Sequence, residues 1–140
     1  MAAANVPEGL HLVLGGAGVA LLIVFLGALR ARLRSREGEA GALSATAVIG
    51  GSVLGAGMLV AVAIDEPDLT KLLAFPSAVT LLAASIGIVS TGALPRAVAY
   101  AGFVAAALQA GVLVAEAAGL AVFALWALLA SVAMLRSPAD

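Results

Sequence analysis

Few side chains in this 140-residue sequence have the chemistry of an active site. His11 is the single histidine and there is no cysteine. The sequence therefore cannot supply a haem-ligand pair, a thiolate nucleophile or an HExxH zinc site. We predict no catalytic residue, no metal site and no cofactor, and we expect that the protein is not an enzyme. His11 itself is expected to be a polar residue at a membrane interface.

Two candidate polar residues, Gln109 and Glu116, lie within the longest apolar stretch, residues 97–135. Glu116 is the only charged residue there, and an acid inside a membrane suggests a proton-coupled transport site. We favour the alternative that Glu116 is a hydrated turn residue at the outer interface. Gln109 either lines a polar path or hydrogen-bonds to a neighbouring helix, and the second arrangement is the commoner one.

Arginine supplies six of the seven basic residues: Arg30, Arg32, Arg34, Arg36, Arg96 and Arg136. The four in the segment 30–36 either bind anionic lipid headgroups or set the membrane topology as solvated charges. We favour topology, because Glu37 and Glu39 follow closely and dilute the positive charge. The net charge is −1, and neither a phosphate-binding loop nor a nucleic-acid-binding signature is present, so no nucleic-acid partner is expected.

The elements that carry these residues are predicted to be transmembrane helices. Hydrophobic residues make up 64% of the chain and charged residues 11%, whereas soluble domains average about 25% charged residues. Too few polar residues are present to cover a soluble surface, so lipid must be the solvent. The predicted fold class is an all-α, integral membrane bundle in a single domain, residues 1–140.

The length of the apolar segments predicts five spans. A helix needs about 20 residues to cross the hydrocarbon core. As one helix, the 39 residues of 97–135 would extend about 58 Å, nearly twice that thickness, so we divide the segment at Glu116. The predicted spans lie at about 10–29, 41–64, 72–92, 97–115 and 117–135.

Local signals place several helix ends. The first helix should continue past the lipid through the arginines and stop near Gly38. Asp68 is a candidate N-cap for the third helix, Gly92 should end it, and Pro95 should lie near the first turn of the fourth.

The distribution of basic residues predicts the orientation. With five spans, all six arginines fall on one side and only Lys71 on the other. Because basic loops stay in the cytoplasm, the N-terminus should lie outside and the C-terminus inside, in a multi-pass protein of the inner (plasma) membrane. No basic segment precedes the first apolar stretch, so we expect no cleaved signal peptide.

Small residues recur at spacings that favour close helix packing. Gly51 and Gly55 share one face of the second predicted helix, and a second group shares a face of the fourth: Gly102, Ala106 and Ala110. These faces pack either within the chain, which we favour, or against a homo-oligomer or membrane-protein partner. Trp126 should fill a gap opposite small residues and find an acceptor for its indole N–H.

Two loop regions resemble a known group of proteins. The run FLGALRARLR (25–34), with Glu37-Gly38-Glu39 and Leu43-Ser44-Ala45 after it, and the motif Thr91-Gly92 with Leu94-Pro95-Arg96 resemble small multi-spanning actinobacterial membrane proteins of unknown function. Ala97 and the short outer loop 65–71 depart from that group. The resemblance implies a membrane fold and no catalytic residues.

The sequence therefore predicts a non-enzymatic packing or interaction subunit of the membrane, with membrane lipids as its surroundings. The alternative is a small oligomeric transporter or channel-like protein that uses Glu116 and Gln109.

Overall fold

A computed structural model of the chain describes residues 8–37, 41–64, 72–111 and 118–136. These residues form five helices: α1 (Glu8–Glu37), α2 (Ala42–Ile64), α4 (Ala74–Thr91), α5 (Arg96–Gly111) and α6 (Ala118–Arg136). The described part of the chain is all-helical, as predicted, and contains five helices.

Glycine and proline define several helix ends. Gly92 has a left-handed backbone (φ 64°), and its N–H donates to Ile88 O at 2.9 Å, which ends α4. Pro95 O accepts from Val98 N in the first turn of α5. Both features were predicted from the sequence.

The start of α4 lies at Ala74, with Leu73 at the N-cap position. The predicted N-cap, Asp68, lies outside the described residues. Pro76 is the third residue of the helix, where a missing N–H costs nothing because the first turn has no intrahelical acceptors.

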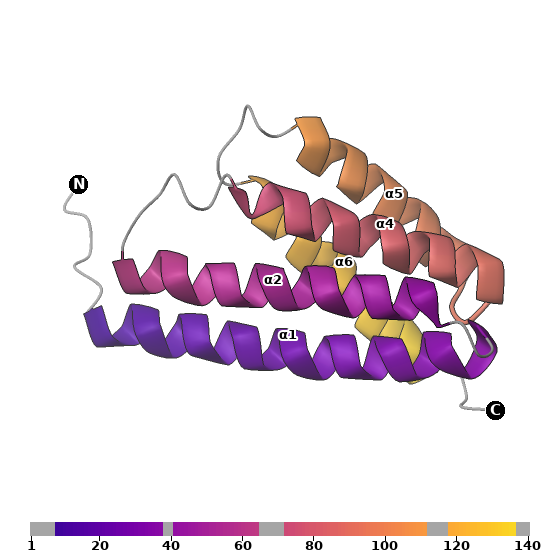
Figure 1. The fold of residues 1–140 in the computed structure, drawn as a ribbon, viewed down its shortest axis with the longest axis horizontal. Helices are drawn as coiled ribbons and strands as arrows, with labels where there is room; N and C mark the ends of the chain where they lie inside the picture. The colour runs from indigo at the N-terminus through magenta and orange to yellow at the C-terminus, as the bar shows by residue number, and fades with distance from the viewer. Residues whose placement is uncertain (1–7, 38–40, 65–71, 112–117, 137–140) are drawn as a thin grey trace.

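The helices alternate in direction around α4. Each helix packs against the next one described, and α4 also contacts α1 and α6, so it touches all four other helices (Figure 1). The C-terminal ends of α1, α4 and α6 and the N-terminal ends of α2 and α5 therefore lie together. We call this side of the bundle the basic end.

The core combines aromatic and aliphatic side chains from all five helices. Trp126 of α6 is 2% exposed and meets Phe25 of α1 edge to face, with ring centroids 5.8 Å apart. Leu54, Leu81 and Ile88 are fully buried between α2, α4 and the other helices.

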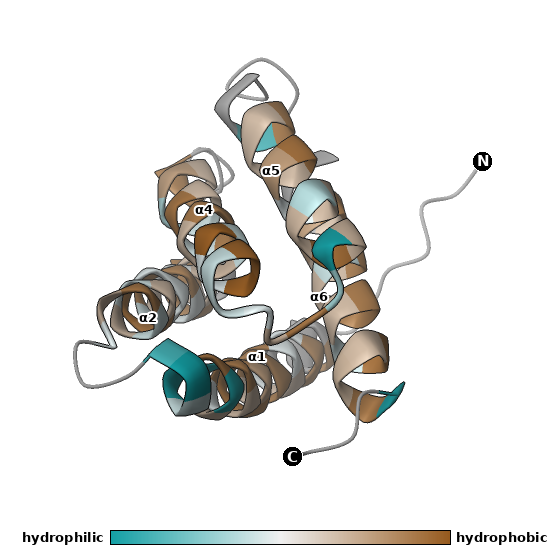
Figure 2. Cartoon of the chain, turned by 90° about the vertical axis from the view of Figure 1, so that its right-hand side faces the viewer, coloured by the Kyte–Doolittle hydropathy of each residue, from teal (hydrophilic) through white to brown (hydrophobic). Residues whose placement is uncertain are grey.

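Large apolar side chains also cover the outside of the bundle. Leu21 is 71% exposed, Val24 is 70% exposed and Leu128 is 64% exposed, and Figure 2 shows apolar residues along the outer sides of the helices. Among the described residues, three helical segments are long and apolar enough to cross a membrane: Val13–Glu37, Ala42–Ala61 and Ala74–Thr91. The apolar segment Ala121–Arg136 is shorter.

Candidate functional site

Four of the five buried polar residues among those described form what we call the polar interior: Ser77, Thr80 and Ser85 of α4, and Gln109 of α5. The fifth is Ser44, at the start of α2. Each of the four is at most 1% exposed, so these side chains face protein and not the surroundings. An unpaired polar group inside an apolar bundle costs free energy, so the partner of each one is informative.

Gln109 links α5 to α4. The Ser77 hydroxyl hydrogen-bonds to the Gln109 side-chain amide oxygen, and it also lies 2.9 Å from Ala74 O. Gln109 is only 1% exposed. The side chain therefore lies in an interhelical contact, one of the two arrangements considered from the sequence.

Thr80 lies at a close contact between α2 and α4. Its hydroxyl donates to Pro76 O of its own helix at 2.7 Å. A Cβ built on Gly50 of α2 would lie 2.7 Å from Thr80 Oγ1 and 3.2 Å from Pro76 O. Only a glycine at position 50 allows the two backbones to approach this closely.

Ser85, Gly102 and Trp126 form a second close contact, between α4, α5 and α6. A Cβ on Gly102 would lie 2.1 Å from Ser85 Oγ and 2.8 Å from Trp126 Nε1. The Trp126 indole N–H donates to Val98 O at 3.0 Å, so the predicted acceptor exists. Ser85 Oγ is buried and has no hydrogen-bond partner among the described residues.

At the basic end, α1 donates hydrogen bonds to the ends of two other helices. Arg32 Nη1 donates to Met134 O in the last turn of α6 at 2.7 Å. Arg36 Nη1 donates to Gly92 O, at the end of α4, at 3.0 Å. The last carbonyls of a helix have no intrahelical partner, so these arginines satisfy acceptors that would otherwise need water.

Glu37 plays the opposite role at the start of α2. Its two carboxylate oxygens accept from Ser44 N at 3.1 and 3.2 Å. This contact places a negative charge at a helix N-terminus, where the helix dipole favours it.

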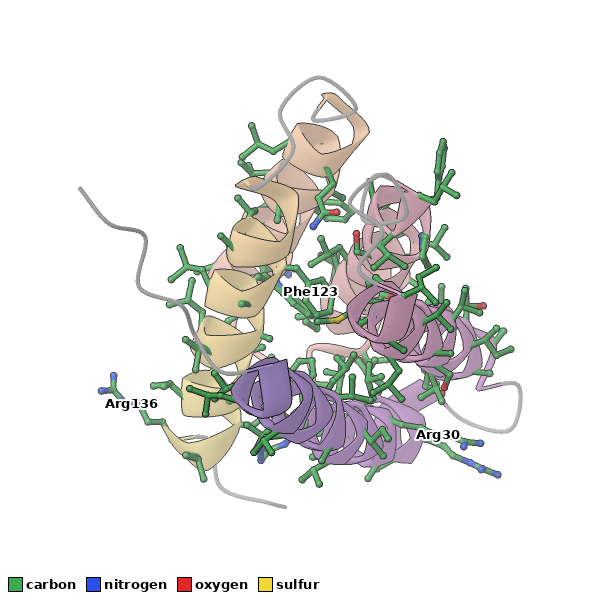
Figure 3. All side chains as sticks on the ribbon, turned by 90° about the vertical axis from the view of Figure 1, so that its left-hand side faces the viewer. Arg30, Phe123 and Arg136 are labelled. Carbon is green, nitrogen blue, oxygen red and sulfur yellow. The ribbon has the colours of Figure 1, made fainter. Side chains whose placement is uncertain are left out.

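The other four arginines are exposed: Arg30, Arg34, Arg96 and Arg136. Hydrophilic residues gather at the ends of α1, α5 and α6 that face the viewer in Figure 2. In Figure 3, Arg30 and Arg136 point away from the bundle on opposite sides, whereas Phe123 lies inside it.

The small-residue positions lie at helix contacts within the chain. A Cβ on Gly51 would lie 2.3 Å from Leu26 Cδ1, and one on Gly55 would lie 3.5 Å from Val19 Cγ1, both on α1. Gly102 and Ala106 are buried in α5. The side chain of Ala110 lies outside the described part of the structure.

Two further candidates cannot be placed. Glu116 lies outside the described residues, and so does the side chain of His11, although its backbone belongs to α1. Among the described residues, no group of three or more His, Cys, Asp or Glu side chains that could hold a metal ion occurs.

The hydrogen bonds of Arg32 and Arg36 were not predicted from the sequence. Their partners are 102 and 56 residues away along the chain. Both acceptors are main-chain carbonyls, which every residue has, so the residue types do not indicate them. The ends of the two helices that they contact were predicted, and these ends were the only sequence indication of where free acceptors would lie.

Comparisons with models of protein families, with curated proteins and with solved structures find no match. The resemblance to small actinobacterial membrane proteins stays a prediction.

Proposed function

We propose that this chain is a five-span integral membrane protein of the plasma membrane that acts as a non-enzymatic packing or interaction subunit. The observation that carries the membrane assignment is the inverted distribution of side chains. Leu21, Val24 and Leu128 are all more than 60% exposed, whereas Ser77, Ser85 and Gln109 are buried. Water would penalise this arrangement and lipid favours it.

The lengths of α5 and α6 are compatible with two further spans. Sixteen residues of α5 extend about 24 Å and nineteen of α6 about 28 Å, against a hydrocarbon core of about 30 Å. Residues at the ends of a short span reach the headgroups, or the bilayer thins locally at modest cost.

The proposed orientation has the basic end in the cytoplasm and the N-terminus outside. All six arginines lie on α1, α5 and α6 near that end, and arginine-rich loops are retained in the cytoplasm.

The environment of Gln109 favours a packing role over transport. A transport path needs its polar groups to face an accessible channel. Gln109 instead contacts Ser77 and is 1% exposed. The polar interior therefore resembles the interhelical hydrogen bonds that hold membrane helices together.

Single-cysteine labelling tests the orientation. The sequence has no cysteine, so each introduced cysteine is the only reactive thiol. In intact cells, an impermeant maleimide should label H11C and K71C, while S35C and D140C should react only after the membrane is permeabilised. Labelling of S35C from outside would contradict the proposed orientation.

Photo-crosslinking tests the role as an interaction subunit. We would place a photoreactive amino acid in turn on three outer helix faces, at Val24, Ile49 and Leu128. One face should give a protein adduct of discrete mass, and the other two should give only lipid adducts. Adducts with lipid alone from every face would count against an interaction subunit. Proton flux in proteoliposomes that is lost in E116Q would support the transporter alternative.

A further inference from the structure

The arginines of α1 divide into two sets with different surroundings. Arg32 and Arg36 donate to carbonyls at the ends of α6 and α4. Arg30 and Arg34 are exposed, lie one helical turn apart on the same face of α1, and have no hydrogen bond or ion pair with any described residue. Packing therefore explains the first pair and not the second.

The exposed pair lies at the depth of lipid headgroups. The outer apolar face of α1 begins at Leu10, and Arg30 follows after 20 residues, about 30 Å of helix. Arg34 lies four residues, about 6 Å, further on. In a hydrocarbon core of about 30 Å, the Arg30 guanidinium group lies at the boundary at which phosphates are found, and the Arg34 guanidinium group lies among the headgroups just beyond it.

The surface beside these arginines has room for a lipid. Gly27 precedes Arg30 by three residues, and a Cβ built on it would meet nothing within 4 Å. Ala31 lies between the two arginines and is exposed as well. An acyl chain and headgroup can therefore approach the α1 backbone closely under both guanidinium groups.

No described acid neutralises the pair. Glu37 is the only acid at the basic end among the described residues, and both of its carboxylate oxygens accept from Ser44 N of α2. The planar guanidinium group of arginine presents donors that match the oxygens of a phosphate. Because two such groups carry two positive charges, they favour a headgroup with a net negative charge over one whose phosphate is balanced by an ammonium group.

We propose that Arg30 and Arg34 form a binding site for the phosphate of an anionic phospholipid in the leaflet at the basic end. This inference rests on the membrane insertion and orientation given under the proposed function. It assigns a ligand to two of the six arginines and leaves the other four outside the site.

Native mass spectrometry of the full chain in mild detergent tests the site. Titration with phosphatidylglycerol and with phosphatidylcholine should show selective binding of phosphatidylglycerol. In R30Q/R34Q the association constant for phosphatidylglycerol should fall by about 25-fold, which corresponds to about 1 kcal/mol for each arginine. The matched control R96Q/R136Q removes two exposed arginines from the same end but from α5 and α6, and should bind like the wild type.

Three results would overturn the proposal: no preference for phosphatidylglycerol in the wild type, an equal loss in R96Q/R136Q, or displacement of the lipid by millimolar glycerol 3-phosphate, which would mark a site for soluble anions. If R30Q/R34Q is not monodisperse, the single variants R30Q and R34Q are measured instead. Each should lower the association constant for phosphatidylglycerol by about fivefold. Membrane insertion is read separately by the cysteine labelling, so a failed lipid preference in an inserted protein refutes this site alone.

Discussion

At the residue scale, Gly102 allows α4, α5 and α6 to pack closely against one another. G102A would place a methyl carbon 2.1 Å from Ser85 Oγ and 2.8 Å from Trp126 Nε1. The serine hydroxyl can rotate, but the indole is held by Val98 O and Phe25, so α5 must move. We expect a loss of about 1–3 kcal/mol in unfolding free energy, measured by denaturation in mixed micelles.

Two controls make that test specific. G27A adds the same methyl group where nothing lies within 4 Å, and its stability should stay within about 0.5 kcal/mol of the wild type. S85A/G102A removes the atom nearest to the new methyl group, Ser85 Oγ, and should recover part of the lost stability. A G102A protein as stable as G27A would contradict the contact.

The hydrogen bond between Ser77 and Gln109 is also a residue-scale feature. A double-mutant cycle with S77A and Q109L should give a coupling free energy of about 0.6 kcal/mol, the average found for hydrogen bonds between membrane helices, and no more than about 1.7 kcal/mol. Thr80 supplies the control, because its hydroxyl donates within α4, to Pro76 O. The T80A and Q109L changes should therefore be additive, and coupling as large as that of the Ser77 pair would show that the effect is not specific.

At the element scale, the ends of α4 and α6 depend on α1. Arg32 is half-buried, and R32Q removes its charged hydrogen-bond donor to Met134 O. We therefore expect the unfolding free energy to fall by about 1–2 kcal/mol. Amide hydrogen exchange should quicken in the last turn of α6 and stay unchanged in α2.

R30Q is the matched control for this change, since Arg30 is an exposed arginine on the same helix without a partner among the described residues. Its stability in lipid-free detergent should equal that of the wild type. Equal losses in R30Q and R32Q would point to net charge rather than to the carbonyl contact.

The elements themselves were largely predictable from the sequence. Apolar length predicted the number of helices, and Gly92 and Pro95 predicted two of the ends because each has a local backbone preference. Leu73 at the N-cap position of α4 could not be predicted, because its side chain makes no capping hydrogen bond and its residue type gives no signal. The contacts of Arg32 and Ser77 depend on which helices become neighbours, and residue types do not encode that.

At the scale of the whole molecule, the apolar exterior gives a direct test of lipid exposure. L21K replaces a side chain that is 71% exposed. In water this change would be nearly neutral, but within a bilayer a lysine near the middle of a helix costs about 2.5–3.5 kcal/mol for insertion. We expect a lower inserted fraction in carbonate extraction of membranes.

L135K is the matched control for L21K. Leu135 is 87% exposed, but it lies beside Arg136 at the end of α6, where a lysine reaches the headgroups. Insertion of L135K should be unaffected. If both variants insert equally well, the outer face of α1 does not lie in lipid.

The long-range contacts of α1 also have a consequence for biosynthesis. Arg32 leaves the ribosome 102 residues before Met134, and Arg36 leaves 56 residues before Gly92. At translation rates of about 5–20 residues per second, Arg32 is made roughly 5–20 s before its acceptor. During that interval the insertion machinery can recognise these arginines as positive charges, which stay in the cytoplasm in the proposed orientation. The hydrogen bond from Arg32 to Met134 O forms only after α6 has been made, so a nascent chain that stalls before α6 would keep the proposed orientation without this contact.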